Sequence, residues 1–305
     1  MDIFLAGATG TLGRRLVPQL IERGHCVVGT TRSPERAAAL HEHGAEAVVV
    51  DPLDAAAVRA AVERARPEVV VHQLTALTGI GLSRNFDKTF ALTNRLRTEG
   101  TDHLIAAARA AGARRLVWQS YAGWPSARKG GPLTDEDAPL DPDPPADARE
   151  SLAAIRHLEA AVTGADGMEG VVLRYGGFYG PGTSIDEGGE HVKLLRKRRF
   201  PVGGGGAGVW SLVHIDDAAA ATVAAIEGGA PGIYNVVDDA PLPVAELLPA
   251  LASAVGAPQP RRLPGWLVRL MAGEQALSMM TRIRGASNAT AKRELGWAPV
   301  RTLVQ

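Results

Sequence analysis

A glycine-rich turn close to the start of the chain limits the folds that this sequence can adopt more than any other feature. The stretch "AGATGTLGRRL" lies between a short apolar run and an amphipathic helical run. Glycines allow a tight turn and a close backbone approach, and the following helix N-terminus offers free N–H groups to a pyrophosphate. This order of strand, turn and helix predicts a dinucleotide-binding unit, with a purely structural turn as the alternative. The residues expected to contact the cofactor here are Gly7, Thr9, Gly10, Thr11, Leu12 and Gly13.

Strand-like and helix-like runs alternate through the first half of the chain. Continuous apolar strands separated by helices indicate an α/β fold, a doubly wound parallel sheet (Rossmann) covered on both faces. A smaller C-terminal substrate-binding region is expected to complete the cleft. Strands are predicted at 2–7, 25–32, 45–51, 67–74, 113–120, 170–177, 209–215 and 232–237, with one long helical run over 85–112. The predicted division is a dinucleotide-binding domain, 1–175 with 209–236, and a substrate-binding cap, 176–208 with 237–305.

Charge and cysteine content exclude several classes of protein. The chain has 33 Lys plus Arg and 33 Asp plus Glu, and general binding to nucleic acid or an anionic membrane needs a basic excess. No apolar run approaches the roughly 18 residues that cross a bilayer. The single cysteine, Cys26, is expected to be a buried inert thiol in a cytoplasmic protein. No metal site is expected, because His41 and His43 lack the i, i+4 spacing of helical ligands.

The end of the second predicted strand bears on the choice of cofactor. An NAD-binding protein carries Asp or Glu about 20 residues after the glycines, where it accepts from the ribose 2′-OH. This chain has "GTTRSPER", with Arg32 after Thr31 and Arg36 one turn into the next helix. Arginine attracts a 2′-phosphate that a carboxylate would repel. The sequence therefore favours NADP (NADPH) over NAD. The alternative is that Arg32 is solvated and that the site binds both cofactors without preference.

The chain resembles the extended or atypical short-chain dehydrogenase/reductases of the NAD(P)-dependent epimerase/dehydratase family. The segments that carry the resemblance are "GATGTLG", "VVVDPLD", "VVVHQLTAL", "ALTNRLRTEGT", "RRLVWQSYAGWP", "LRYGGFYGPG", "SLVHIDDAAAA" and "NATAKRELGWAP". By this resemblance Asp51 contacts adenine, Ser120 takes the position of a catalytic hydroxyl and Asn94 is a structural asparagine. Further implied cofactor neighbours are Pro52, Leu53, Leu74, Thr75, Ala76, Tyr175, Gly177 and Phe178.

The sequence departs from the family at its usual proton donor. In the family a Tyr-x-x-x-Lys pair lies on the helix after the long loop, here "ARESLAAIRHLEAAV". With Glu159 as the anchor, Ser151 and Ile155 take these positions, and a one-residue slip gives Glu150 and Ala154. None of the tyrosines has a lysine four residues later. Any proton donor is therefore predicted at the end of the fifth strand, from Ser120 or Tyr121.

These observations predict an NADP(H)-binding oxidoreductase or epimerase-like enzyme for a polar small molecule, which could carry a phosphate or a nucleotide. The alternatives are an inactive cofactor-binding regulator or redox sensor, and a lyase or isomerase without net redox chemistry. A homodimer is one alternative for the oligomeric state. The Pro-, Gly- and Asp-rich loop 124–147 is predicted to be a mobile lid. The basic run 193–200 is interpreted as a solvated helix face or a phosphate site, and Trp124, Trp210 and Trp266 as packing residues or cleft walls.

Overall fold

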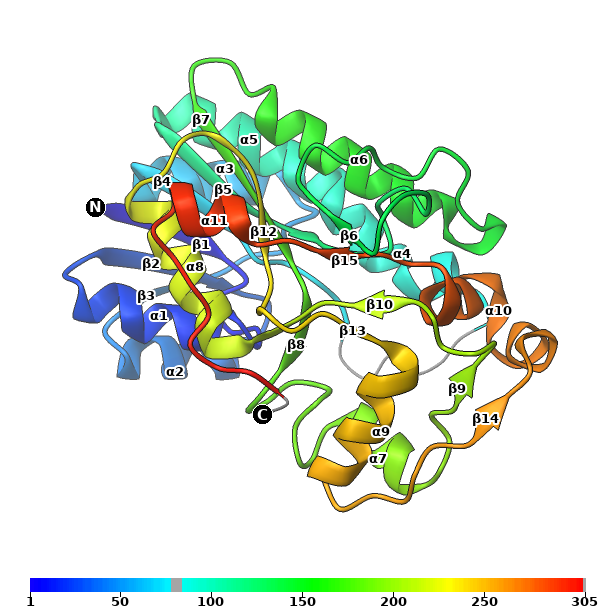
Figure 1. Cartoon of the computed structure of the whole chain (residues 1–305). Coiled ribbons are helices and arrows are strands. Elements are labelled where there is room, and N and C mark those ends of the chain that lie inside the picture. Colours follow the sequence, from blue (N-terminus) through cyan, green and yellow to red (C-terminus); the bar gives the residue numbers. More distant parts are fainter. Residues whose placement is uncertain (78–83, 304–305) are drawn as a thin grey trace.

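A seven-stranded parallel sheet forms the centre of the molecule, in the strand order β12-β7-β5-β4-β1-β2-β3 (Figure 1). The computed structural model describes residues 1–77 and 84–303. The strands are β1 (Asp2–Ala6), β2 (Cys26–Thr31), β3 (Glu46–Val49), β4 (Val69–His72), β5 (Arg115–Tyr121), β7 (Glu169–Tyr175) and β12 (Gly232–Val236). The predicted α/β class, a doubly wound parallel sheet, is confirmed.

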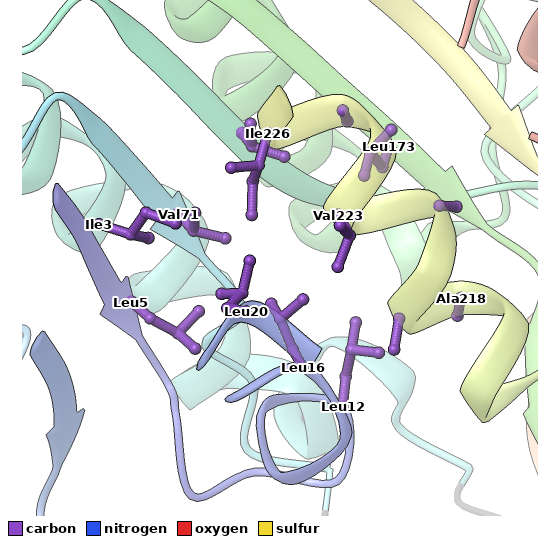
Figure 2. Packing of buried hydrophobic residues seen from close by; sticks show 14 of the residues in the cluster. Ile3, Leu5, Leu12, Leu16, Leu20, Val71, Leu173, Ala218, Val223 and Ile226 are labelled. Atoms are coloured by element: carbon purple, nitrogen blue, oxygen red, sulfur yellow. The ribbon is translucent and has the colours of Figure 1, made fainter. Parts of the chain in front are cut away.

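Helices cover both faces of this sheet and bury two separate apolar cores. On one face, α1 (Gly13–Glu22) and α8 (Ile215–Glu227) pack together over β1, with α2 (Pro34–Glu42) beside them. Leu12, Leu16 and Leu20 of the α1 region follow helical spacing and point at Val223 and Ile226 of α8 (Figure 2). On the other face lie α3 (Ala55–Ala65), α5 (Glu99–Ala111) and α6 (Arg149–Thr163). This packing holds the turn between β1 and α1 at the carboxyl ends of the strands.

The helical run expected over 85–112 is two helices. α4 (Phe86–Arg97) ends at Thr98, whose φ of −98° and ψ of −84° are not helical, and α5 begins at Glu99. The Thr98 hydroxyl donates to the carbonyl of Asn94 at 3.0 Å, a local bond that commonly bends helices. The break turns the last residue of α4, Arg97, toward the interior of the protein, where it is 8% exposed.

Short elements of the C-terminal half enclose a third core beside the sheet. The small pairs are β10 (Val209–Trp210) with β13 (Leu242–Pro243), β9 (Val202–Gly203) with β14 (Arg262–Leu263), and β8 (Gly177–Tyr179) with β11 (Leu212–His214). The helices are α7 (Glu190–Arg196), α9 (Val244–Ala254) and α10 (Gly265–Thr281). In contrast, α11 (Ala289–Glu294) and Trp297 pack on the large core. The proposed boundaries of the cap stay a prediction, and they assign these last residues to the cap.

The long segment after β5 contains its own anchors. β6 (Leu133–Thr134) pairs with β15 (Gly285–Ala286), and Arg128 forms a 2.6 Å ion pair with Asp141. A one-turn 3₁₀ helix (Ala146–Ala148) leads into α6. Whether 124–147 moves as a lid stays a prediction.

The expectation of a buried cysteine is wrong. Cys26 is exposed, because the first residue of β2 lies at the N-terminal end of the strand, outside the region that the helices cover. Within the described residues, no helix is long and apolar enough to cross a bilayer.

Candidate functional site

A large cavity lies across the carboxyl ends of the central strands. β1 has β2 on one side and β4 on the other, so the strand order reverses at this point, where ligands bind in open α/β sheets. The cavity has a volume of about 1040 Å³. Thirteen of the predicted cofactor residues line it: Gly7, Thr9, Gly10, Thr11, Leu12, Arg32, Arg36, Pro52, Leu74, Thr75, Tyr175, Gly177 and Phe178. The remaining wall comes from α4, the segment after β5 and the C-terminal region.

The glycine turn has the geometry of a phosphate cradle. Gly7 has φ +92°, and a Cβ there would lie 2.7 Å from the carbonyl oxygen of Gln73, the residue that follows β4. A Cβ on Gly13 would lie 2.4 Å from the Gly7 oxygen, so this glycine allows α1 to pack against the turn. Across the described chain, the N–H groups of Thr11 and Leu12 donate to no acceptor. Orphan donors at a helix N-terminus suit a diphosphate, so the residues present fit NAD(P).

Two arginines and two threonines form the wall of the cavity beyond β2. The hydroxyl of Thr30 accepts from the N–H of Gly7 at 3.1 Å, and Thr9 and Thr31 share a 3.2 Å hydroxyl bond. These bonds tie the end of β2 to the glycine turn. Arg32 and Arg36 are exposed at the cavity, and neither forms a salt bridge within the part of the chain that the structure describes. Both guanidinium groups are therefore available to an anionic group bound in the cavity near the end of β2.

Five predicted cofactor residues lie outside the cavity wall. Asp51 is exposed and accepts from the N–H of Leu53 at 3.0 Å. Gly13 packs beneath the turn, and the N–H of Ala76 donates to Thr93. Asn94 donates to Ser151 at 3.0 Å. A direct contact of these side chains with the cofactor therefore stays a prediction, and Asn94 instead holds α4 against α6.

The two residues predicted as proton donors face opposite ways. β5 continues through Tyr121, and successive side chains of a strand alternate between faces. Gln119 and Tyr121 line the cavity, whereas Ser120 is 2% exposed and donates to Glu159 on α6 at 2.7 Å. The structure thus brings Tyr121 to the cavity and does not bring Ser120 there. Burial raises the pKa of Tyr121 to about 12.

In α6, the residues at the positions of the family's Tyr and Lys make packing contacts in the interior. Ser151 is fully buried, and its hydroxyl donates to Asp87 of α4 at 2.6 Å. Asp87 also accepts from the backbone N–H groups of Glu150 and Ser151. Ile155 belongs to an apolar cluster with Leu152. Neither Ser151 nor Ile155 lines the cavity, so α6 presents no phenol and no ammonium group to it.

The floor of the cavity includes a buried polar pair, Gln73 directly after β4 and Tyr175 at the end of β7. Gln73 donates to the Tyr175 hydroxyl at 3.3 Å, which is also 2.7 Å from the Thr222 hydroxyl. The side-chain oxygen of Gln73 is buried and accepts no hydrogen bond from the described residues. His72 is different, because it stacks on Trp118 outside the cavity and burial lowers its pKa to about 4. In this environment His72 is a packing residue.

The opposite end of the cavity is rich in aromatic rings. Phe86 stacks on Phe90 at 4.2 Å and meets Trp124 edge-on at 5.3 Å. Trp210, Phe178 and Phe200 also line the cavity, as do Met279, Met280 and Ile283. Trp266 is 68% exposed and does not line it. From the basic run, Lys193 alone reaches this wall among the described residues.

Sequence reasoning missed several residues of this wall, chiefly Arg97, Phe86, Phe90, Gln73 and Gln119. A signal exists for three of them, because Phe86, Phe90 and Arg97 are spaced to share one face of α4. That spacing alone does not distinguish a face turned to a cavity from one turned to a core.

Comparison with known proteins places these features in a family. The model of the NAD dependent epimerase/dehydratase family matches residues 3–236. The chain belongs to this family. The resemblance predicted from the sequence is confirmed.

Individual relatives include reductases and epimerases. A 3-diazoavenalumate denitrifying reductase from Streptomyces sp. is 47% identical over 98% of this chain and 96% of that protein. A 2-alkyl-3-oxoalkanoate reductase from Stenotrophomonas maltophilia is 32% identical over 85% of this chain and 77% of that protein. The crystal structure of a UDP-glucose 4-epimerase from Thermotoga maritima, with UDP-glucose, matches at a TM-score of 0.77. It is 22% identical and covers 99% of this chain and 95% of the epimerase, which shows a shared fold.

Proposed function

We propose that this protein is an NADPH-dependent reductase of a small aromatic molecule. The observation that carries the proposal is the 47% identity, over nearly the whole of both chains, to a reductase of a diazo compound. The lining of the cavity supports it, since a cofactor cradle at one end meets a wall of phenylalanine and tryptophan rings at the other. Such rings suit a flat aromatic substrate better than a sugar diphosphate.

Recognition of NADPH would rest on three parts of the site. The N–H groups of Thr11 and Leu12 face the diphosphate, Arg32 and Arg36 the 2′-phosphate, and the amide oxygen of Gln73 supplies an unused acceptor on the cavity floor. Reduced nicotinamide, when bound, supplies a hydride. Tyr175, a buried residue of the floor whose hydroxyl is already bonded, serves to hold Gln73 in place.

A diazo substrate accounts for the missing acid on α6. Reduction of a ketone creates an alkoxide that must take up a proton, the task of the family's tyrosine. Replacement of a diazonium group by hydrogen is balanced without an added proton: Ar–N₂⁺ and one hydride give Ar–H and N₂. A site with Ser151 and Ile155 in place of the acid pair is compatible with that reaction.

The test is NADPH consumption, measured at 340 nm, with a diazo-substituted hydroxyarene and a matched aryl ketone. We expect oxidation of NADPH with the diazo compound, one N₂ released per NADPH, and slower turnover of the ketone. Tight cofactor binding without turnover of either compound would contradict the proposal and favour a cofactor-binding regulator. Equal turnover of the two compounds would contradict the diazo substrate class while leaving a reductase.

A further inference from the structure

A buried arginine of the cavity wall, Arg97, has no ion-pair partner among the described residues. Arg97, at the end of α4, is 8% exposed and lines the cavity. Its guanidinium forms no hydrogen bond and no ion pair within the described residues, and Nη1 is fully buried. The segment 78–83, "TGIGLS", contributes no carboxylate by its sequence. A buried charge without a partner is strongly destabilising, so this arrangement requires a reason.

The neighbouring carboxylate is already occupied. Glu159 accepts from Arg174 through both oxygens, at 2.8 and 2.7 Å, and from the Ser120 hydroxyl at 2.7 Å. Its field raises the pKa of Arg97, although burial outweighs this effect and lowers that pKa to about 10. One carboxylate thus lies among two buried guanidinium groups, and a net positive charge remains at Arg97.

The anionic groups of a bound cofactor would have other partners in the cavity. The N-terminus of α1 would hold the diphosphate, and Arg32 and Arg36 would hold the 2′-phosphate of NADPH. Arg97 instead shares one face of α4 with Phe86 and Phe90, in the aromatic part of the wall. The charge therefore lies where a substrate, and not a phosphate of the cofactor, would reach it.

We propose that Arg97 is the anion-binding residue of the substrate site, and that the substrate is an aryl compound with a carboxylate or phenolate oxygen. Its ring packs on Phe86, Phe90 and Trp124, and its anionic oxygen accepts from the planar guanidinium. This inference rests on the proposed function for the identity of the site as a substrate site. It adds a charge requirement that neither the cofactor cradle nor the hydride chemistry imposes.

Binding of matched probes to the NADP⁺-loaded protein tests this without turnover. Cinnamate supplies a ring and a carboxylate, and cinnamamide has the same shape without the charge. By calorimetry we expect cinnamate to bind at least tenfold more tightly than cinnamamide. Arg97→Gln should remove this preference, and Arg97→Lys should retain part of it. Arg95→Gln is the control, since Arg95 lies two residues earlier on the exposed face of α4 and pairs with Glu99.

Several outcomes would overturn the assignment. They are equal or undetectable binding of the two probes to wild type, or a cinnamate preference that persists in Arg97→Gln. A loss of NADP⁺ affinity in Arg97→Gln, with the probe preference intact, would assign the guanidinium to the cofactor. Thermal unfolding supplies a second readout: the Gln variant should keep or raise Tm, and a clear fall would indicate a structural role. If the protein binds cinnamate through Arg97 but never oxidises NADPH, the proposed reductase activity is refuted and the assignment of Arg97 stands.

Discussion

The hydroxyl of Ser120 and the carboxylate of Glu159 meet at 2.7 Å in the interior, between β5 and α6. Glu159 also receives the guanidinium of Arg174 from β7, so three elements are joined through one buried carboxylate. Ser120 therefore has a structural partner on the side of the sheet away from the cavity. Its position in the family's motif does not bring its hydroxyl to the wall of the cavity.

Glu159→Gln should destabilise the fold. The substitution leaves Arg174, which is 5% exposed, with a charge that nothing neutralises. Breaking a buried pair in this way costs about 3–5 kcal/mol. Urea unfolding monitored by circular dichroism measures it. The control is Glu63→Gln, whose partner Arg59 lies on the exposed face of α3 and which should leave the midpoint unchanged. A similar small effect of both substitutions would show that the Glu159 network adds little.

The cofactor preference should depend on Arg32. We expect NADP⁺ to bind more tightly than NAD⁺, and Arg32→Ala to reduce that ratio roughly tenfold to a hundredfold through loss of a charge-assisted contact. Calorimetry with both cofactors measures the ratio. Arg109→Ala is the control, because Arg109 lies in the last turn of α5, shortly before β5 begins, and so at the opposite edge of the sheet. Equal wild-type affinities, or a ratio unchanged by Arg32→Ala, would be incompatible with this prediction.

Ligand binding should alter hydrogen exchange in the segment 124–147. Trp124 lines the cavity, whereas amides such as Ala127 and Asp141 already donate to backbone carbonyls of the same segment. We expect those two amides to exchange slowly throughout, and their unbonded neighbours to gain protection when NADP⁺ and an aryl ligand bind. Mass spectrometry after timed labelling reads this out. Strong protection of the whole segment in both states would exclude a mobile lid.

The sequence allowed prediction of the parts of the site that depend on local chain geometry. Gly7, Gly10 and Arg32 were identifiable because a turn between a strand and a helix, and the end of a parallel strand, place residues at the same edge of the sheet. The side of β5 to which Ser120 points depends on how far that strand continues. The sequence "SYAGWP" predicts that the strand ends at Ser120, whereas β5 continues through Tyr121.

The role of Arg97 could not be predicted for a related reason. In the sequence it lies in a run with Arg95 and Glu99 that is typical of a solvated helix face. The break at Thr98 and the packing of α4 on α6 bury it, and both depend on tertiary contacts. For Cys26 the error is the reverse, because a residue expected to be buried is exposed. An apolar strand sequence does not indicate where the helices that cover the strand end.

Tyr121 should matter for a substrate that needs a proton and not for one that does not. It is the phenol that β5 presents to the cavity, and burial raises its pKa to about 12. The phenol is therefore protonated at neutral pH, and its ionisation should not limit turnover there. Tyr121→Phe should lower kcat for an aryl ketone about 10²- to 10⁴-fold. The same variant should keep near wild-type kcat for a diazo substrate, where no alkoxide forms.

Two further variants separate the candidates for this proton transfer. Ser120→Ala should lower stability and leave kcat for the ketone unchanged, because its hydroxyl faces Glu159. Ser151→Ala removes the hydroxyl that binds Asp87 and should likewise act on stability. Steady-state kinetics with both substrates, alongside urea unfolding of each variant, distinguishes these effects. If Tyr121→Phe and Ser120→Ala keep wild-type rates on the ketone while Ser151→Ala loses them, the proton donor lies on α6. Tyr121 would then be a packing residue of the substrate wall.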